Sequence, residues 1–406
     1  MKTDSNWVDA LAARQKPGYT LDAIFYTDPS IFALERERLF PNDWIYVGHI
    51  SQIPRTGDFL TYNLAEESVI VVRTESGELR AFANVCRHRG SRVCDALSGR
   101  VKQFVCPYHG WVYRLDGTLR SARLFPETFD TSEFGLQGMS LKEFHGLIFV
   151  SFKAKPESFE PMERSIGHCF DAFGLDKAKV AAQITYPVEA NWKLTLENYL
   201  ECYHCAPAHP EFSQSHSIKL PHGTYPELDD ALLQRAELAG TCCDDIFSAF
   251  RVDDSNHVSY GYDRYALFEG YETGSKDGKR VAPLMGSIRA FDGGASNGQF
   301  GNLCYLLAYC DHTVLYRFTP RTAAYTEMDI FWLVHAEAVE GKDYDRDDLV
   351  WLWDVTSIAD KTIIERNQAG VRSGFYRPGP YAPMEDWVMQ FRDWYLQQLT
   401  DSSLSR

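Results

Sequence analysis

The sequence predicts an α+β chain in which a small antiparallel β domain precedes a larger domain of mixed helices and strands. Short strand-like segments dominate from Trp44 onward, and the pattern changes after about Glu157 to helices alternating with strands. The length of 406 residues and the 45% hydrophobic content suit two domains with a core each. The predicted division is an N-terminal arm over 1–42, a first domain over 43–155 and a second domain over 156–406.

The arm and the first domain contain one helical segment followed by short strands and tight turns. Gly77 and Asp116-Gly117 indicate hairpins, because these residues tolerate the positive backbone angles of two-residue turns. The predicted elements are a helix over 29–39 and strands over 44–47, 59–63 and 68–72.

The second domain alternates between segments with helical periodicity and segments with strand periodicity. The segment 213–300 is rich in Gly, Asp and Ser and is expected to be irregular, supplying loops over a pocket. The predicted helices cover 162–173, a segment beginning near 191, a segment beginning at 344 and 384–399. The predicted strands cover 181–188, 301–312, 314–318 and 327–334.

Two cysteine–histidine pairs in the first domain have the spacing of a metal cluster. Cys86 and His88 are followed, after seventeen residues, by Cys106 and His109, which gives C-x-H-x17-C-x-x-H. Two thiolates and two imidazoles hold a [2Fe–2S] cluster when each type of ligand binds one iron. The alternative is a zinc site, but zinc fingers pair Cys with Cys and His with His, whereas each loop here carries one of each.

A second metal site is predicted near residue 200. His204 and His209 with a carboxylate would hold a ferrous ion on one face and leave the other face open for O2. On an unbroken helix these two side chains would point roughly 140° apart. Both can reach one metal if the helix breaks, and Pro207 is the expected break.

Two carboxylates, those of Glu201 and Asp360, are candidates for the third ligand of this site. Glu201 precedes His204 by three residues, which also suits a hydrogen bond that fixes the orientation of a ligating imidazole. Asp360 shares an apolar helical stripe with Trp353, where a bare carboxylate would be costly. We therefore predict His204, His209 and Asp360 as iron ligands, with Asp354 as the alternative to Asp360.

These motifs resemble those of the catalytic α subunits of Rieske non-heme iron oxygenases, over essentially the whole chain. The resemblance implies a Rieske β domain joined to a helix-grip domain, in which an antiparallel sheet wraps a long helix. It implies a homotrimer in which the acid at Glu201, usually Asp in the family, bridges the cluster of one subunit to the iron of the next. It also implies a separate reductase with flavin and iron–sulfur centres that draws electrons from NAD(P)H, and it places the late Asp ligand at Asp360.

Several segments resemble the glycine-betaine, stachydrine and carnitine oxygenases within this family. The expected reaction is therefore oxidation of an N-methyl group of a quaternary ammonium compound, with release of formaldehyde. The alternatives are hydroxylation or O-demethylation of an aromatic acid and, in another class, a non-catalytic electron carrier. An aromatic cage would suit a trimethylammonium group, but we interpret the cluster Tyr260, Tyr262, Tyr265, Phe268 and Tyr271 as packing.

Composition limits the partners. The net charge of −15 disfavours nucleic acid or an anionic membrane as a partner. We expect no secretory signal, because the first residues carry no apolar core, and no apolar run approaches the roughly 20 residues of a membrane span. Ten cysteines in a chain of this size are expected to be reduced thiols in a cytoplasm. Accordingly, Cys202, Cys205 and the pair Cys242-Cys243 are interpreted as structural or incidental.

Overall fold

Residues 44–156 form one structural unit, and residues 1–43 together with 157–406 form the other. The computed structural model describes residues 6–221, 223–242, 251–252, 258–401 and 404. The N-terminal arm therefore belongs to the same unit as the second half of the chain. Among the described residues, no helix is both long and apolar enough to cross a bilayer.

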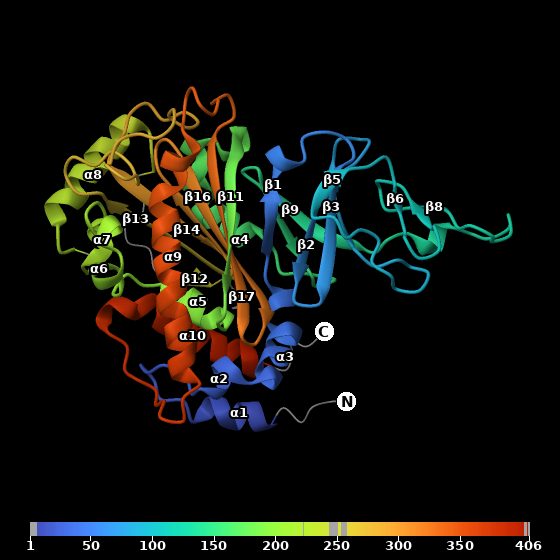
Figure 1. Cartoon of the computed structure of the whole chain (residues 1–406), viewed down its shortest axis with the longest axis horizontal. Coiled ribbons are helices and arrows are strands. Elements are labelled where there is room, and N and C mark those ends of the chain that lie inside the picture. Colours follow the sequence, from blue (N-terminus) through green and yellow to red (C-terminus); the bar gives the residue numbers. More distant parts are fainter. Residues whose placement is uncertain (1–5, 222, 243–250, 253–257, 402–403, 405–406) are drawn as a thin grey trace. The chain divides into compact units, whose positions relative to one another are not determined.

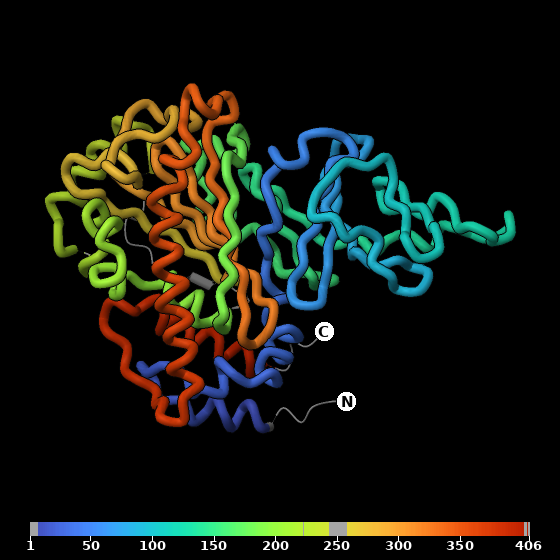
Figure 2. The backbone as a smooth tube through the Cα atoms, viewed as in Figure 1, coloured from blue at the N-terminus to red at the C-terminus, as the bar shows by residue number. Residues whose placement is uncertain are grey.

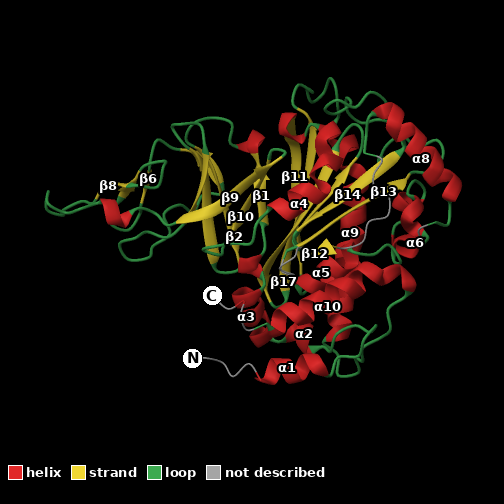
Figure 3. Cartoon of the chain, turned by 180° about the vertical axis from the view of Figure 1, so that it is seen from behind, coloured by secondary structure: helices red, strands yellow, loops and turns green. Residues whose placement is uncertain are grey.

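The unit 44–156 is built almost wholly of strands and loops (Figure 3). Its main sheet is antiparallel with the order β1-β10-β9-β4-β3-β2-β5, and β6-β7-β8 form a second, smaller sheet. As predicted, Gly77 and Gly117 take positive φ values, of 85° and 86°, in the turns between β3 and β4 and between β7 and β8. The strands are β1 (Ile45–His49), β2 (Asp58–Leu64), β3 (Glu67–Arg73), β4 (Leu79–Ala83), β5 (Ser98–Arg100), β6 (Phe104–Val105), β7 (Val112–Tyr113), β8 (Leu119–Ser121), β9 (Gly138–Phe144) and β10 (Leu147–Ser151).

The core of this unit reaches into the segments that carry the predicted cluster ligands. Cys86 and Cys106 are buried in the same hydrophobic cluster as Phe59, Ile70 and Trp111. Because both cysteines are anchored in a packed interior, the loops that bear them are held in place before any metal binds.

The other unit is organised around a seven-stranded antiparallel sheet with the order β11-β17-β16-β15-β14-β13-β12. The long helix α9 (Arg346–Val371) runs along this sheet (Figure 1), and its buried side includes Leu352, Trp353 and Ser357. Asp345 caps its first turn by accepting from the backbone N–H groups of the residues two and three positions later. The strands are β11 (Ala178–Val188), β12 (Arg251–Val252), β13 (Ser259–Ala266), β14 (Gly294–Phe300), β15 (Cys304–Ala308), β16 (Thr313–Thr322) and β17 (Tyr325–His335).

Helices from both ends of the chain pack together beside this sheet, as Figure 2 shows for the first and last segments. The buried Glu35 carboxylate accepts hydrogen bonds from Trp192 Nε1 at 2.7 Å and Tyr395 Oη at 2.6 Å, and it pairs with Lys193. These contacts tie the arm and the C-terminal helix to the helix before the predicted iron site. The remaining α-helices are α1 (Asn6–Ala13), α2 (Ile24–Thr27), α3 (Pro29–Arg38), α4 (Glu160–Ile166), α5 (Trp192–Tyr199), α6 (Cys205–Ala208), α7 (Pro210–Ser213), α8 (Pro226–Ala239) and α10 (Asp386–Thr400).

The expectation of an irregular segment over 213–300 is wrong for much of its described part. That segment contains α8 and two strands of the sheet, β13 and β14. The glycines of β14 mark close packing rather than loops. A Cβ added at Gly298 would lie 2.5 Å from the Phe170 ring, and one at Gly294 would lie 2.5 Å from Leu232.

Candidate metal centres

The two cysteine–histidine loops have the same backbone hydrogen bond and the same glycine conformation. The carbonyl of Cys86 accepts from the N–H of Gly90 at 2.9 Å, and the carbonyl of Cys106 accepts from the N–H of Gly110 at 3.0 Å. Both glycines have positive φ, at 80° and 71°, which side-chain-bearing residues rarely adopt. The loop between β4 and β5 and the loop between β6 and β7 therefore present their Cys and His side chains from equivalent turns.

The four predicted cluster ligands pair by type. Cys86 and Cys106 are 3% and 2% exposed, and the rings of His88 and His109 lie 4.7 Å apart. Trp111 stacks on His88 with 4.9 Å between ring centroids. His88 Nδ1 is buried and has no hydrogen-bond partner within the described part of the chain. A buried imidazole nitrogen without a partner is rare, so this donor set fits a [2Fe–2S] cluster bound by two Cys and two His.

Tyr113 adds a hydrogen bond at the cysteine side of this centre. Its hydroxyl lies 3.1 Å from Cys86 Sγ and accepts from the backbone N–H of Arg87 at 3.0 Å. Burial and the bond to Cys86 raise the pKa of Tyr113, which keeps the hydroxyl protonated. The O–H is therefore free to donate to the sulfur, a contact that sets the reduction potential of such clusters.

The second predicted centre lies where a helix breaks. Asn191 caps α5, which ends at Tyr199, so His204 lies in the turn before α6. The expected break at Pro207 is wrong, because Pro207 lies within α6, in a first turn that needs no proline N–H. The second break falls at His209, whose non-helical φ of −128° and ψ of 72° follow from Pro210 after it.

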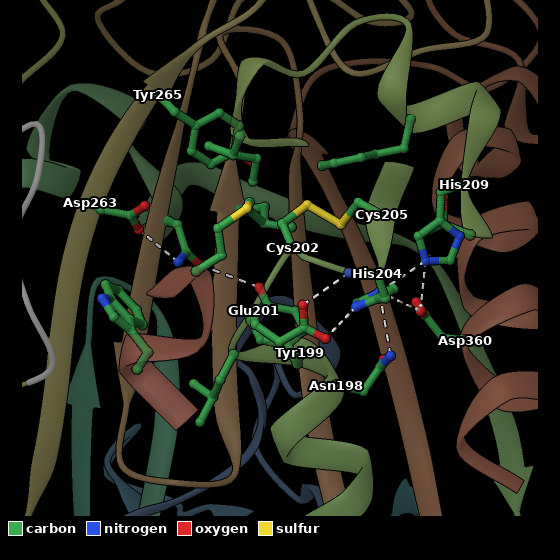
Figure 4. A pocket seen from close by; sticks show the side chains of 18 of the residues that line it. Asn198, Tyr199, Glu201, Cys202, His204, Cys205, His209, Asp263, Tyr265 and Asp360 are labelled. Carbon is green, nitrogen blue, oxygen red and sulfur yellow. Dashed lines mark hydrogen bonds and ion pairs between the residues drawn. A yellow bond between two sulfur atoms is a disulfide. The ribbon is translucent and has the colours of Figure 1, made fainter. Parts of the chain in front are cut away.

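These breaks turn both imidazoles toward one carboxylate on α9, as Figure 4 shows. His204 Nε2 lies 3.2 Å from His209 Nε2 and 3.2 Å from Asp360 Oδ1, and His209 Nε2 lies 2.8 Å from the same oxygen. Neighbouring ligands at right angles around a metal about 2.1 Å away would be about 3 Å apart. The triangle therefore fits two His and one carboxylate on one face of a metal ion.

Glu201 forms a hydrogen bond with His204 on the ring nitrogen that points away from the triangle. Its Oε1 lies 2.6 Å from His204 Nδ1, while Oε2 accepts from the backbone N–H groups of Tyr203 and His204. This bond keeps the proton on Nδ1 and leaves Nε2 for a metal. Burial alone would lower the pKa of His204, but Asp360 and Glu201 outweigh it and raise the pKa to about 9, so a metal ion that binds Nε2 displaces a proton from it. The alternative ligand Asp354 lies apart from the triangle and accepts from Tyr186 Oη.

The expectation that the cysteines are reduced is wrong for one pair. Cys202 and Cys205 form a disulfide across the turn between α5 and α6, with their Cα atoms 4.9 Å apart. The turn that exposes His204 brings residues three positions apart within bonding reach, which the sequence spacing alone did not reveal. Cys242 Sγ lies 3.2 Å from Cys169 Sγ, and Cys243 lies outside the described residues.

The metal triangle opens into a cavity of about 490 Å³, a volume typical of small-molecule sites. Its described lining includes six Tyr, Phe and Trp side chains, and it also includes the carboxylate of Asp263, which accepts from Asn297 Nδ2 at 2.7 Å. Tyr265, interpreted above as a packing residue, also lines it. Several lining residues were not predicted from the sequence, although strand alternation places Asp263 and Tyr265 on one face of β13. The missed lining residues include Tyr199, Phe212, Asp263, Asn297 and Tyr316.

Comparison with known proteins agrees with both centres. The family of ring-hydroxylating α subunits (catalytic domain) matches residues 175–401, and the Rieske [2Fe–2S] domain family matches residues 43–133. The glycine betaine monooxygenase oxygenase subunit of Pseudomonas aeruginosa is 35% identical over 411 residues, covering 97% of this chain and 92% of that protein. The carnitine monooxygenase oxygenase subunit of Escherichia coli is 38% identical over 211 residues, covering 50% of this chain and 55% of that protein.

Solved structures support the fold. A crystal structure of the quaternary ammonium Rieske monooxygenase CntA superposes with a TM-score of 0.73 at 22% identity, covering 96% of this chain and 98% of the other. A naphthalene 1,2-dioxygenase superposes with a TM-score of 0.66 at 21% identity, covering 96% of this chain and 94% of the other. The predicted fold, a β domain with a cluster followed by a sheet wrapped on a long helix, is confirmed.

Proposed function

Because the chain belongs to the family of Rieske oxygenase α subunits, we propose that it oxidises an N-methyl group of a quaternary ammonium compound resembling glycine betaine and releases formaldehyde. The observation that carries this proposal is the cavity at the metal triangle, whose lining combines several aromatic rings with the buried carboxylate of Asp263. Aromatic faces and a carboxylate both attract a substituted ammonium ion. The glycine betaine and carnitine oxygenase subunits among its relatives support the same substrate class.

Each centre has a proposed set of ligands. Cys86, His88, Cys106 and His109 would hold the [2Fe–2S] cluster, and the triangle of His204, His209 and Asp360 described above would hold a mononuclear ferrous ion. When bound, the cluster supplies electrons one at a time and the ferrous ion activates O2. Accordingly, we assign 43–155 to the cluster domain, 156–406 to the catalytic domain and 1–42 to an arm.

Glu201 is the proposed link between the two centres. Its carboxylate is bonded to His204 Nδ1 and is 12% exposed, so it can accept a further hydrogen bond from outside the cavity. We propose that a cluster histidine of a neighbouring subunit supplies that bond in a homotrimer. Glu201 would then orient His204 and carry the electron path between subunits.

The proposed reaction balances as a monooxygenation. One O2, two electrons and two protons convert an N–CH3 group to N–CH2OH and release water. The hydroxymethyl group then leaves as formaldehyde, the C–N bond breaks, and the nitrogen keeps the bonding pair while the hydroxyl proton is released. The aromatic walls hold the methyl group at the metal triangle and keep water away from it.

The partners follow from the family. Its oxygenase subunits oligomerise and work with a separate reductase; we propose a reductase with flavin and iron–sulfur centres that uses NAD(P)H. The proposed location is the cytoplasm.

The test is a substrate panel with formaldehyde and O2 measured together. The purified chain, a surrogate reductase and NADH would be given choline, glycine betaine, stachydrine, carnitine and several methoxylated or unsubstituted aromatic acids. Formaldehyde equal to O2 consumed for a quaternary ammonium compound, and for no aromatic acid, is the expected result. Coupled O2 use with an aromatic acid alone would replace the proposed substrate by that class, as in an aromatic-acid hydroxylase or O-demethylase.

A further inference from the structure

Asp263 is a buried acid that neither metal centre uses. It lies on β13, is 6% exposed and faces the cavity that contains the metal triangle (Figure 4). Its Oδ1 accepts from Asn297 Nδ2 at 2.7 Å, across the pair of neighbouring strands β13 and β14. No Lys or Arg forms an ion pair with it among the residues that the structure describes. The neighbouring Arg264 pairs with Asp292 instead.

The side chains that line the cavity are acidic overall. Its described lining residues include four carboxylates and two histidines, but no Lys or Arg. Three of the four acids have other partners or lie near solvent: Glu201 bonds to His204, Asp360 belongs to the metal triangle, and the exposed Asp386 accepts from Gln390. Asp263 is therefore the buried negative charge in this cavity for which the described chain supplies no cation.

Burying the ionised carboxylate of Asp263 is energetically unfavourable. Burial raises the pKa of Asp263 to about 7, and the hydrogen bond from Asn297 offsets part of that rise. A cation that pairs with a buried carboxylate offsets much of the cost of burying it. A ligand that brings its own positive charge would supply the missing partner.

Aromatic rings complete a site for such a ligand. Tyr265 shares the face of β13 that bears Asp263. Tyr199 and Tyr316 lie 5.0 Å apart between ring centroids, and Tyr316 lies 5.9 Å from Trp353, all lining the same cavity. Ring faces around a methylated ammonium group stabilise it without needing hydrogen bonds, which such a group cannot donate.

We propose that Asp263 is the counter-ion of the substrate's ammonium group, and that the preferred substrate is a quaternary ammonium cation without a carboxylate of its own. This rests on the proposed function and narrows it. A betaine would bring its carboxylate into a cavity whose described lining offers no basic side chain beyond the two metal-facing histidines. If the carboxylate of a bound betaine lay about 8 Å from the Asp263 carboxylate, their repulsion at an effective dielectric of about 20 would correspond to roughly a 30-fold loss in binding.

The test is equilibrium binding to the iron-loaded protein without reductant, so that turnover is not needed. Choline and glycine betaine share the trimethylammonium group and differ in one end, an alcohol or a carboxylate. The neutral analogue 3,3-dimethylbutan-1-ol keeps the shape of choline without its charge. We expect choline to bind at least about tenfold more tightly than glycine betaine and the neutral analogue.

Two variants locate the effect. Asp263→Asn should weaken choline binding at least about tenfold and leave the neutral analogue within about twofold. Asp347→Asn, which removes one charge from a carboxylate that is 95% exposed at the start of α9, should change neither. An unchanged thermal midpoint, or a higher one, would show that Asp263→Asn folds, and Asp263→Glu should retain part of the affinity.

The outcomes separate this inference from the proposed function. Glycine betaine binding as tightly as choline, with both unaffected by Asp263→Asn, would overturn the inference while coupled N-demethylation still upheld the proposed function. Absence of coupled O2 use with every quaternary ammonium compound would overturn the proposed function itself. Equal binding of choline and its neutral analogue would show that the cavity recognises shape rather than charge and would also overturn the inference.

Discussion

Replacing Asp263 by Asn should stabilise the protein without substrate, and increasingly so as the pH rises. Burial raises the pKa of this carboxyl from 3.8 to about 7. Between these values the folded chain binds a proton that the unfolded chain has lost, so stability falls as the pH increases. Integrated over that range, the cost of Asp263 is about 2 kcal/mol at pH 5.5 and about 4 kcal/mol at pH 8.

The Asn variant removes that cost and retains the local geometry. Its side-chain oxygen can still accept from Asn297 Nδ2, as the carboxylate does at 2.7 Å. Tyr199 and Tyr265, which lie near Asp263, stay protonated because burial raises the pKa of both phenols. The other acids of the cavity are the same in both proteins, so their contribution cancels in the comparison.

The assay is thermal unfolding of both proteins at pH 5.5 and pH 8, at one scan rate and without substrate. The stability gap in favour of Asp263→Asn should widen by about 2 kcal/mol between the two pH values, or about 3 °C in the midpoint. A gap that is constant with pH, or one that narrows, would refute the argument that Asp263 is an uncompensated buried charge.

Three further changes test separate parts of the account. Glu201→Gln should lower coupled oxygenation by about 10–100-fold while cluster and iron contents stay unchanged, because the carboxylate orients an iron-facing imidazole; activity near that of the wild type would count against this role. Tyr113→Phe should lower the cluster's reduction potential by about 60 mV in an EPR-monitored titration, since the hydroxyl 3.1 Å from Cys86 Sγ donates to a sulfur that is more negative when reduced. An unchanged or higher potential would show that this hydrogen bond does not tune the cluster. Mass spectrometry of unreduced peptides should find Cys202 and Cys205 about 2 Da lighter than the dithiol form, and free thiols at both positions would rule out the disulfide.

Sequence spacing, together with the family resemblance for Asp360, predicted side chains that the structure brings together. The pattern of Cys86 to His109 is specific because two short loops each need one thiolate and one imidazole for a shared cluster. The helical stripe containing Asp360 was equally informative, since Trp353 and Asp360 lie two turns apart on one face of α9 and both line the cavity.

Features that depend on tertiary contacts could not be predicted from the sequence as well. The helix before His204 ends at Tyr199 rather than at Pro207, where the proline suggested a break. Asp263 lies within a segment whose glycines suggested loops, whereas glycines of that segment allow side chains such as Phe170 to pack closely on β14. The role of a single acid on a strand can be inferred only when the sheet, the cavity and the lack of a described cationic partner are known.

The most direct test of the two-centre account is iron and acid-labile sulfide per chain in the wild type and in His204→Ala. The account predicts about three irons and two sulfides in the wild type, and about two irons and two sulfides in the variant, with an unchanged cluster spectrum and no coupled oxygenation. Three irons retained in His204→Ala, or loss of the cluster together with the third iron, would contradict the assignment of a separate iron site at His204, His209 and Asp360.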